Sequence, residues 1–312
     1  MFKTFATVAA AAILSFGTIA APAQAAWPER PVKLLLGSAA GSSIDMIGRL
    51  IAQKLTEKFD QPFVPQNVAG VGLGTFAMTL KNSKSDGYTI GFGLDNNFTN
   101  VAHDPNARFK LAEFKPLCTV FNGDTSYIVA PDCPWKNVKE ALEASRNTPV
   151  SFLFQTAMDR NCFELLASQV PGAQVKMIPQ KSPSTIMSAI MGGHGDIGSS
   201  GGLHYEQARA GKVRTLTIMT SDPSPNYPDV ELAKNLFDDV VCPDAYRVII
   251  VKSDFPAEAE AALTAALQEI CTDPEFEAAI EKLHFIPRYK NTDDTAKIFA
   301  QQYDDLARFW KK

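Results

Sequence analysis

Short apolar runs of strand length alternate with amphipathic runs of helix length along almost the whole chain of 312 residues. The predicted strands span residues 32–36, 62–67, 88–92, 126–130, 150–154, 174–178, 213–219 and 247–251. The predicted helices span residues 43–59, 75–82, 138–146, 159–168, 184–191, 203–210, 257–271, 275–283 and 293–309. Such alternation is typical of α/β folds, in which helices cover mainly parallel sheets. The sequence therefore predicts an α/β protein with helices flanking its sheets.

The first 26 residues read as a targeting segment that precedes the folded part. Lys3 provides a positive start, residues 5–21 are uncharged and rich in Ala, Ile and Leu, and residues 23–25 form an A-x-A cleavage site. A membrane anchor is the alternative, but the apolar run is short for a bilayer span and ends without a cationic stop. We expect export to the periplasm, with cleavage near Ala25 or Ala26.

Length, charge and the spacing of histidines and cysteines exclude several classes of function. The exported part, about 286 residues, is long enough for two domains. The net charge is −4 and 21% of residues are charged, so no polybasic face indicates nucleic acid as a partner. The histidines and the widely spaced cysteines show no metal-ligand or redox spacing, and neither a metal nor a cofactor is predicted. Disulfide pairing stays open among Cys118, Cys133, Cys162, Cys242 and Cys271.

A turn of small residues joins the first predicted strand, residues 32–36, to the helix that follows. Amides at a helix N-terminus carry partial positive charge and can hold a carboxylate, sulfonate or phosphate without a charged side chain. We therefore predict an anion site in this turn. Its candidate contacts are Ser38, Ala39, Gly41, Ser42 and Ser43, with Asp45 orienting the turn. The alternative is a capping box, in which Ser42 and Asp45 only satisfy free amides of the helix.

Other loops rich in Gly, Ser and Asn also follow predicted strands. In open α/β sheets ligands collect at the carboxyl ends of strands, so these loops are expected to converge on one cleft. For any single glycine cluster, a tight turn is the commoner explanation. The candidate ligand contacts in these loops are Gly70, Gly72, Asp95, Asn97, Ser199 and Ser200.

An exported serine hydrolase is the enzyme alternative. Residues 198–202 fit the G-x-S-x-G pattern, with Ser200 as nucleophile and Asp273 and His284 as downstream partners. The chain lacks an upstream His-Gly oxyanion motif, and the pattern often occurs by chance. We therefore expect a non-enzymatic protein.

Several short motifs, in order along the chain, resemble those of the periplasmic solute receptors of tripartite tricarboxylate transporters, the Bug receptors. The exported part opens on Trp27-Pro28-Glu29-Arg30-Pro31-Val32, similar to the family's W/Y-P-x-[RK]-P-[IV]. The turn 38–45 resembles the family's first loop, and residues 67–73 resemble its N-x-x-G-A-G-G loop. Further matches are Ser85-Asp86-Gly87-Tyr88-Thr89-Ile90, Met191-Gly192-Gly193-His194-Gly195-Asp196, Ala210-Gly211-Lys212-Val213-Arg214-Thr215-Leu216 and Pro228-Asp229-Val230.

The resemblance implies a two-lobed, type II periplasmic-binding-protein fold. The first lobe would comprise residues 27–126 and 247–312, and the second residues 127–246. In the family, backbone groups of the two glycine-rich loops hold a ligand carboxylate, and the second lobe closes over it. The implied role is a monomeric receptor that delivers a small organic anion to membrane permease subunits. Docking on a signalling partner would use the same pocket chemistry and stays an alternative.

The chain departs from the family pattern in its second lobe, so the ligand is left open among carboxylates, amino acids and sulfonates. Arg160 begins a predicted helix there, and its guanidinium suits a second anionic group. The alternative is an ion pair with Asp159 or Glu164 on a solvated face. The remaining candidate contacts from this lobe and the crossing are Thr156, Ser199, Ser200 and Tyr246.

Overall fold

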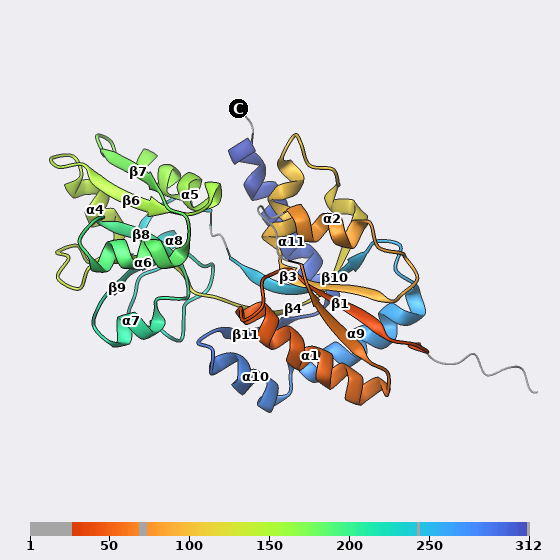
Figure 1. Ribbon diagram of the computed structural model, residues 1–312. Helices are drawn as coiled ribbons and strands as arrows, with labels where there is room; N and C mark the ends of the chain where they lie inside the picture. The colour runs from red at the N-terminus through yellow and green to blue at the C-terminus, as the bar shows by residue number, and fades with distance from the viewer. Residues whose placement is uncertain (1–26, 69–73, 242–243, 311–312) are drawn as a thin grey trace, which may run out of the picture.

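The computed structural model describes residues 27–68, 74–241 and 244–310, which form two α/β lobes side by side (Figure 1). The predicted signal peptide, Gly70, Gly72 and Cys242 lie outside the described residues. The first lobe holds a sheet of order β11-β4-β10-β3-β1-β2. Its strands are β1 (Val32–Leu36), β2 (Phe63–Asn67), β3 (Thr89–Leu94), β4 (Phe114–Asn122), β10 (Tyr246–Lys252) and β11 (Ile286–Lys290).

The second lobe holds a sheet of order β7-β6-β8-β5-β9. Its strands are β5 (Thr125–Val129), β6 (Val150–Phe154), β7 (Val175–Pro179), β8 (Ile197–Gly201) and β9 (Arg214–Ile218). In each sheet a strand that arrives from the other lobe pairs antiparallel with both neighbours: β5 with β8 and β9, and β10 with β3 and β4. The predicted two-lobed α/β fold is confirmed. The sheets are mixed rather than mainly parallel, because of these two strands and of β11, which pairs antiparallel with β4.

Helices cover both faces of each sheet. In the first lobe they are α1 (Ser43–Phe59), α2 (Gly74–Lys81), α3 (Asn96–Thr99), α9 (Ala257–Cys271), α10 (Pro274–Glu281) and α11 (Thr292–Trp310). In the second they are α4 (Val138–Ala144), α5 (Ala157–Ser168), α6 (Pro183–Met191), α7 (Tyr205–Arg209) and α8 (Ala233–Leu236). Two 3₁₀ turns, Val101–His103 and Leu111–Glu113, lie between β3 and β4.

The apolar stripe of α1 shows why the sequence folds this way. Ile44, Ile47, Ile51 and Leu55 are buried against the sheet, together with residues of α9. Gly48 lies on the same face, where a Cβ would come within 2.4 Å of a Leu36 methyl carbon, so a larger residue would force the buried Leu36 side chain to shift. This packing fixes the N-terminus of α1 at the carboxyl end of β1.

The chain crosses between the lobes twice near the middle of the molecule. It leaves the first sheet after Asn122 and enters the second at Thr125, and it returns to the first sheet at Tyr246. The end of α11 makes a further connection, since Leu306 is buried in the core of the second lobe although Phe299 is buried in the first. In Figure 1 the dark blue end of α11 lies between the lobes.

Among the cysteines in the described part of the chain, Cys118, Cys133 and Cys271 are free thiols. Among the described helices, none combines the length and apolar character that crossing a membrane requires.

Candidate ligand-binding site

A cleft of about 1010 Å³ lies between the two lobes. From the first lobe it is lined mainly by α2, α3 and the chain between β3 and β4, and from the second by the start of α5 and the end of β8. Of the predicted contacts, Thr156, Ser199 and Ser200 line it. Thr125, Gln155 and Arg247 also line it and were not predicted. The cleft thus lies at the carboxyl ends of strands, where the sequence placed a ligand.

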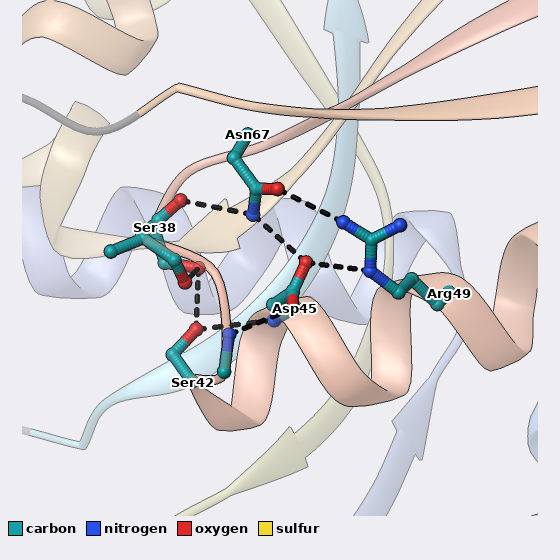
Figure 2. A network of polar contacts seen from close by, with 7 residues as sticks. Ser38, Ser42, Asp45, Arg49 and Asn67 are labelled. Atoms are coloured by element: carbon teal, nitrogen blue, oxygen red, sulfur yellow. Dashed lines mark hydrogen bonds and ion pairs between the residues drawn. The ribbon is translucent and has the colours of Figure 1, made fainter.

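The β1–α1 turn is organised around the carboxylate of Asp45 (Figure 2). One oxygen accepts from the Gly41 amide at 2.8 Å, and the other accepts from Asn67 Nδ2 and Arg49 Nε, each at 2.9 Å. These donors lower the pKa of Asp45 to about 2, with the Gly41 amide contributing most. Gly41 has a φ of +80°, the left-handed region that favours glycine, and this conformation turns its amide onto Asp45.

Capping of the helix is confirmed for Ser42, whereas Asp45 accepts from the Gly41 amide, ahead of the N-cap, and not from a free amide of the helix. Ser42 is the N-cap of α1, and its Oγ accepts from the Asp45 amide at 3.2 Å and lies 2.6 Å from Ser38 Oγ. The Gly41 amide is therefore already occupied in this structure. The amides of Ala39 and Ser43 make no hydrogen bond within the described part of the chain, and no residue of this turn is among the described residues that line the cleft.

Asp95, a predicted ligand contact, is fully buried and hydrogen-bonded within the protein. It accepts from the Asn96 amide at 2.7 Å, the Tyr246 amide at 3.1 Å and Gln302 Nε2 at 2.8 Å. Burial raises its pKa to about 7, against the effect of these donors. Asn97 is buried as well. Neither is among the described residues that line the cleft; Asp95 joins the end of β3 to β10 and α11.

Ser200 lies on the cleft wall and is held from behind by a buried histidine. Ser200 Oγ is 2.8 Å from His204 Nδ1, and His204 Nε2 is 3.1 Å from Thr215 Oγ1 and 3.3 Å from Ser126 Oγ. Burial lowers the pKa of His204 to about 4, so the ring is neutral near pH 7. The hydroxyl of Ser200 is thus held by His204, in a residue that lines the cleft between the lobes.

The predicted hydrolase partners of Ser200 are engaged elsewhere. Asp273 caps α10 by accepting from the amides of Glu275 and Phe276. His284 forms a 2.7 Å contact with Glu206 and stacks on Tyr205. The structure gives Ser200 a different histidine as neighbour, and the residues around His204 are hydroxyls.

Arg160 and Tyr246 were predicted to face the ligand, and the structure places both differently. Arg160 Nε donates to Glu164 at 2.7 Å on the exposed side of α5, which is the ion-pair alternative. Tyr246 is buried in the core of the first lobe, beneath the cleft. Neither is among the described residues that line the cleft.

Arg247 is the functional candidate that the sequence analysis missed. It is only 8% exposed, and its guanidinium carbon lies 5.1 Å from the ring centre of Phe121 and 4.9 Å from that of Phe285. Nη1 donates to the Ala245 carbonyl at 2.7 Å, whereas Nε is buried without a partner. Burial lowers its pKa to about 10, so it remains charged near pH 7. A charged residue opening the apolar run 247–251 was the available signal.

The second loop that the sequence predicted to bind an anion, with Gly70 and Gly72, is outside the described residues. Within the described part of the chain, no group of three or more His, Cys, Asp or Glu side chains is arranged to hold a metal ion.

Comparison with known families matches residues 47–312 to the tripartite tricarboxylate transporter family receptor. This match covers most of the chain. The chain belongs to this family. The family is one of periplasmic solute-binding receptors, as the motifs along the sequence indicated.

A curated relative of this receptor is the UPF0065 protein in the gbd 5' region of Cupriavidus necator. It is 25% identical over 306 residues, which cover 94% of this chain and 91% of the relative. Among solved structures, the TctC solute-binding protein from Polaromonas has a TM-score of 0.77 at 19% identity, covering 91% of this chain and 98% of that one.

Two solved structures with similar folds contain carboxylates. A protein of R. palustris with adipate has a TM-score of 0.71 at 18% identity, covering 91% of this chain and 98% of that one. MatC from Rhodopseudomonas palustris, with bound malate, has a TM-score of 0.70 at 17% identity, covering 91% of this chain and all of the other. At these identities the comparison shows the shared two-lobed fold.

Proposed function

We propose that this receptor captures a small organic anion of the carboxylate class in the cleft between its lobes and delivers it to the permease subunits of a tripartite tricarboxylate transporter. The observation that carries the proposal is the cleft itself, which both lobes line at the carboxyl ends of their strands, in a chain that belongs to this receptor family. Adipate and malate in similar folds support the carboxylate class.

Capture would work by closure of the lobes around the ligand. Ligand contacts to both sides of a hinge favour the closed form, because only that form makes all of them. We propose Thr156, Ser199 and Ser200 as contacts from the second lobe. From the first lobe we propose the free amides of Ala39 and Ser43, beside Ser38, and the loop with Gly70 and Gly72.

The protein would act as a monomer in the periplasm, exported by the segment 1–26 and cleaved near Ala25 or Ala26. Mass spectrometry of the mature protein checks the cleavage site, and size-exclusion chromatography with light scattering checks the monomer. We also propose that binding occurs without chemical change. Recovery of the ligand unaltered after long incubation, followed by NMR, would support this, and a product that disappears in Ser200→Ala would contradict it.

A thermal-shift screen tests the ligand class. A ligand at one hundred times its dissociation constant adds about 2.7 kcal/mol to the free energy of unfolding through mass action. We expect one or more mono- or dicarboxylates to raise the melting temperature and neutral sugars to leave it unchanged. Stabilisation by a sugar and by none of the anions would contradict the carboxylate class.

Uptake of the identified anion tests delivery. In cells lacking the receptor gene, we expect wild-type receptor to restore uptake of the labelled anion only when the permease genes are present. Restored uptake without the permease would contradict the transporter role while leaving the binding activity intact.

A further inference from the structure

We propose that Arg247, at the hinge end of the cleft, binds an anionic group of the ligand and gives the receptor a preference for ligands with two anionic groups. The proposal rests on the proposed function for the ligand class. Arg247 is the second residue of β10, the strand that returns from the second lobe, and it lines the cleft together with Ala245 just before that strand.

The charge of Arg247 is buried without an ion-pair partner among the described residues. No carboxylate of the described residues lies within 4 Å of its guanidinium, in contrast to Arg30, Arg49 and Arg308, which pair with aspartates. Taking a charge out of water without a partner is costly, and buried charges are normally paired. An arginine in this position is explained most simply by a partner that arrives from outside the protein.

The acidic group that acts on Arg247 electrostatically and those that line the cleft are already engaged. Asp95 acts on the charge of Arg247, but its carboxylate accepts three hydrogen bonds from other groups. In the cleft wall, Asp104 accepts from the Asn106 amide at 2.8 Å, and Asp159 accepts from the amide and hydroxyl of Thr156. These aspartates stabilise their own turns and leave Arg247 available to a ligand.

The guanidinium is held in one orientation. The rings of Phe121 and Phe285 lie within cation–π distance, and Nη1 is fixed by the Ala245 carbonyl. Nε and Nη2, on the other edge of the planar group, make no hydrogen bond to any described residue. Two parallel N–H donors on one edge match the two oxygens of a carboxylate. The free edge of Arg247 is therefore suited to a bidentate contact.

The sheet places this edge within reach of the first-lobe turn. Arg247 pairs with Leu94 at the end of β3, and β3 pairs with β1, so the end of β1 is two strands away. Neighbouring strands lie roughly 5 Å apart, which puts the two positions on the order of 10 Å from each other along the sheet edge. A short ligand with an anionic group at each end suits this spacing.

The test compares acids of equal chain length with one or two carboxylates: butyrate with succinate, and hexanoate with adipate. Binding is measured by titration calorimetry and thermal shift for the wild type, Arg247→Met and Arg160→Met. We expect the wild type and Arg160→Met to bind the diacid at least about tenfold more tightly than the matched monoacid, and Arg247→Met to lose this preference. Unchanged diacid affinity in Arg247→Met would overturn the proposal and leave the proposed function standing.

If no carboxylate binds the wild type, a sulfate titration tests the anion site at Arg247 separately from the carboxylate class of the ligand. Sulfate that stabilises the wild type but not Arg247→Met would keep the Arg247 site and reject the carboxylate class. Sulfate that stabilises both proteins, or neither, would reject the site as well.

The melting temperature of ligand-free Arg247→Met tests whether Arg247 has a purely structural role. Since the charge is unpaired, we expect Arg247→Met to melt at or above the wild-type temperature, whereas a structural arginine would lower it. Should the variant not fold, Arg247→Lys serves instead, because it keeps the charge without the planar fork. We expect Arg247→Lys to bind the diacid more weakly than the wild type does and to bind the monoacid equally well. Unchanged affinities for both acids would overturn the proposal.

Discussion

The charged groups near two strand ends on the same edge of the first sheet differ in their partners and in their ionisation. At the end of β1, Asp45 is ionised and surrounded by donors from Gly41, Asn67 and Arg49. At the hinge, where β3 meets β10, Asp95 is fully buried with its pKa raised to about 7, and Arg247 is buried with no ion-pair partner in the described part of the chain.

The difference shows where an unsatisfied group is to be expected. Asp45 and its partners lie close in sequence, apart from Asn67, so the turn satisfies itself locally. The hinge is assembled from segments more than a hundred residues apart, and its charges meet only in the folded protein. A loop rich in small polar residues is therefore a weaker indicator of a ligand than a buried charge without a partner.

The largest expected effect is on the pH dependence of stability through Asp95. Its pKa is raised above the value of 3.8 expected when unfolded, so the folded state holds an extra proton between these values and loses stability as the pH rises through about 7. We expect Asp95→Asn to gain on the order of 3 kcal/mol relative to the wild type between about pH 5 and pH 8.

Urea unfolding of both proteins at several pH values measures this effect. His204, with its pKa lowered to about 4, acts in the opposite direction, because stability falls as the pH drops from 6.5 towards 4. It is present in both proteins and cancels in the difference. If the difference in free energy of unfolding between Asp95→Asn and the wild type did not change with pH, the contrast between the raised pKa of Asp95 and the lowered pKa of Asp45 would be contradicted.

Removal of the Asp45 carboxylate should have the next largest effect. We expect Asp45→Ala to lower the free energy of unfolding by about 2 kcal/mol, since the Gly41 amide and Asn67 lose a charged acceptor. The matched control is Arg49→Ala, expected to cost less than about 1 kcal/mol because its ion pair is exposed. Equal costs would contradict a turn centred on Asp45. The wild-type contribution should disappear as the pH falls from about 4 through about 2.

Ser200 is expected to have a moderate effect on binding. Its hydroxyl is oriented by His204 and lies on the cleft wall, so we expect Ser200→Ala to weaken binding of the identified anion about fivefold, the typical value of one neutral hydrogen bond. Calorimetry measures the affinity, and Ser168→Ala, on the exposed surface of α5, is the control. Identical affinities for the two variants would place Ser200 outside the site.

The smallest effect belongs to Arg160. Because its guanidinium pairs with Glu164 on the exposed side of α5, we expect Arg160→Ala to leave both affinity and stability within experimental error of the wild type. A loss of affinity above about tenfold would show that lobe closure turns Arg160 into the cleft, and would reverse its ranking against Arg247.

The sequence predicted most elements because apolar periodicity is a local property, and the family motifs implied the two lobes. It missed the strands β4, β8 and β11. β4 carries Lys115 and Pro116 near its start, and β11 is a short, mostly half-buried edge strand with Pro287 and Arg288. Both become strands through pairing: β4 with β10 and β11, and β11 with β4. Such long-range pairing leaves little trace in a single segment.

In the cleft wall, Thr156 was predictable because it follows β6 and caps α5. Ser199 and Ser200 were singled out as part of a loop rich in Gly and Ser, but they lie within the strand β8. The motif order alone was sufficient to indicate the receptor family, and the helix cap at Ser42 was readable from spacing. Arg247 was not predictable as a site residue. Its position depends on Phe121, Phe285 and Ala245, which only the tertiary structure brings around it. Local patterns determine which segments form and cap themselves, whereas the burial of a charge depends on which distant segments meet.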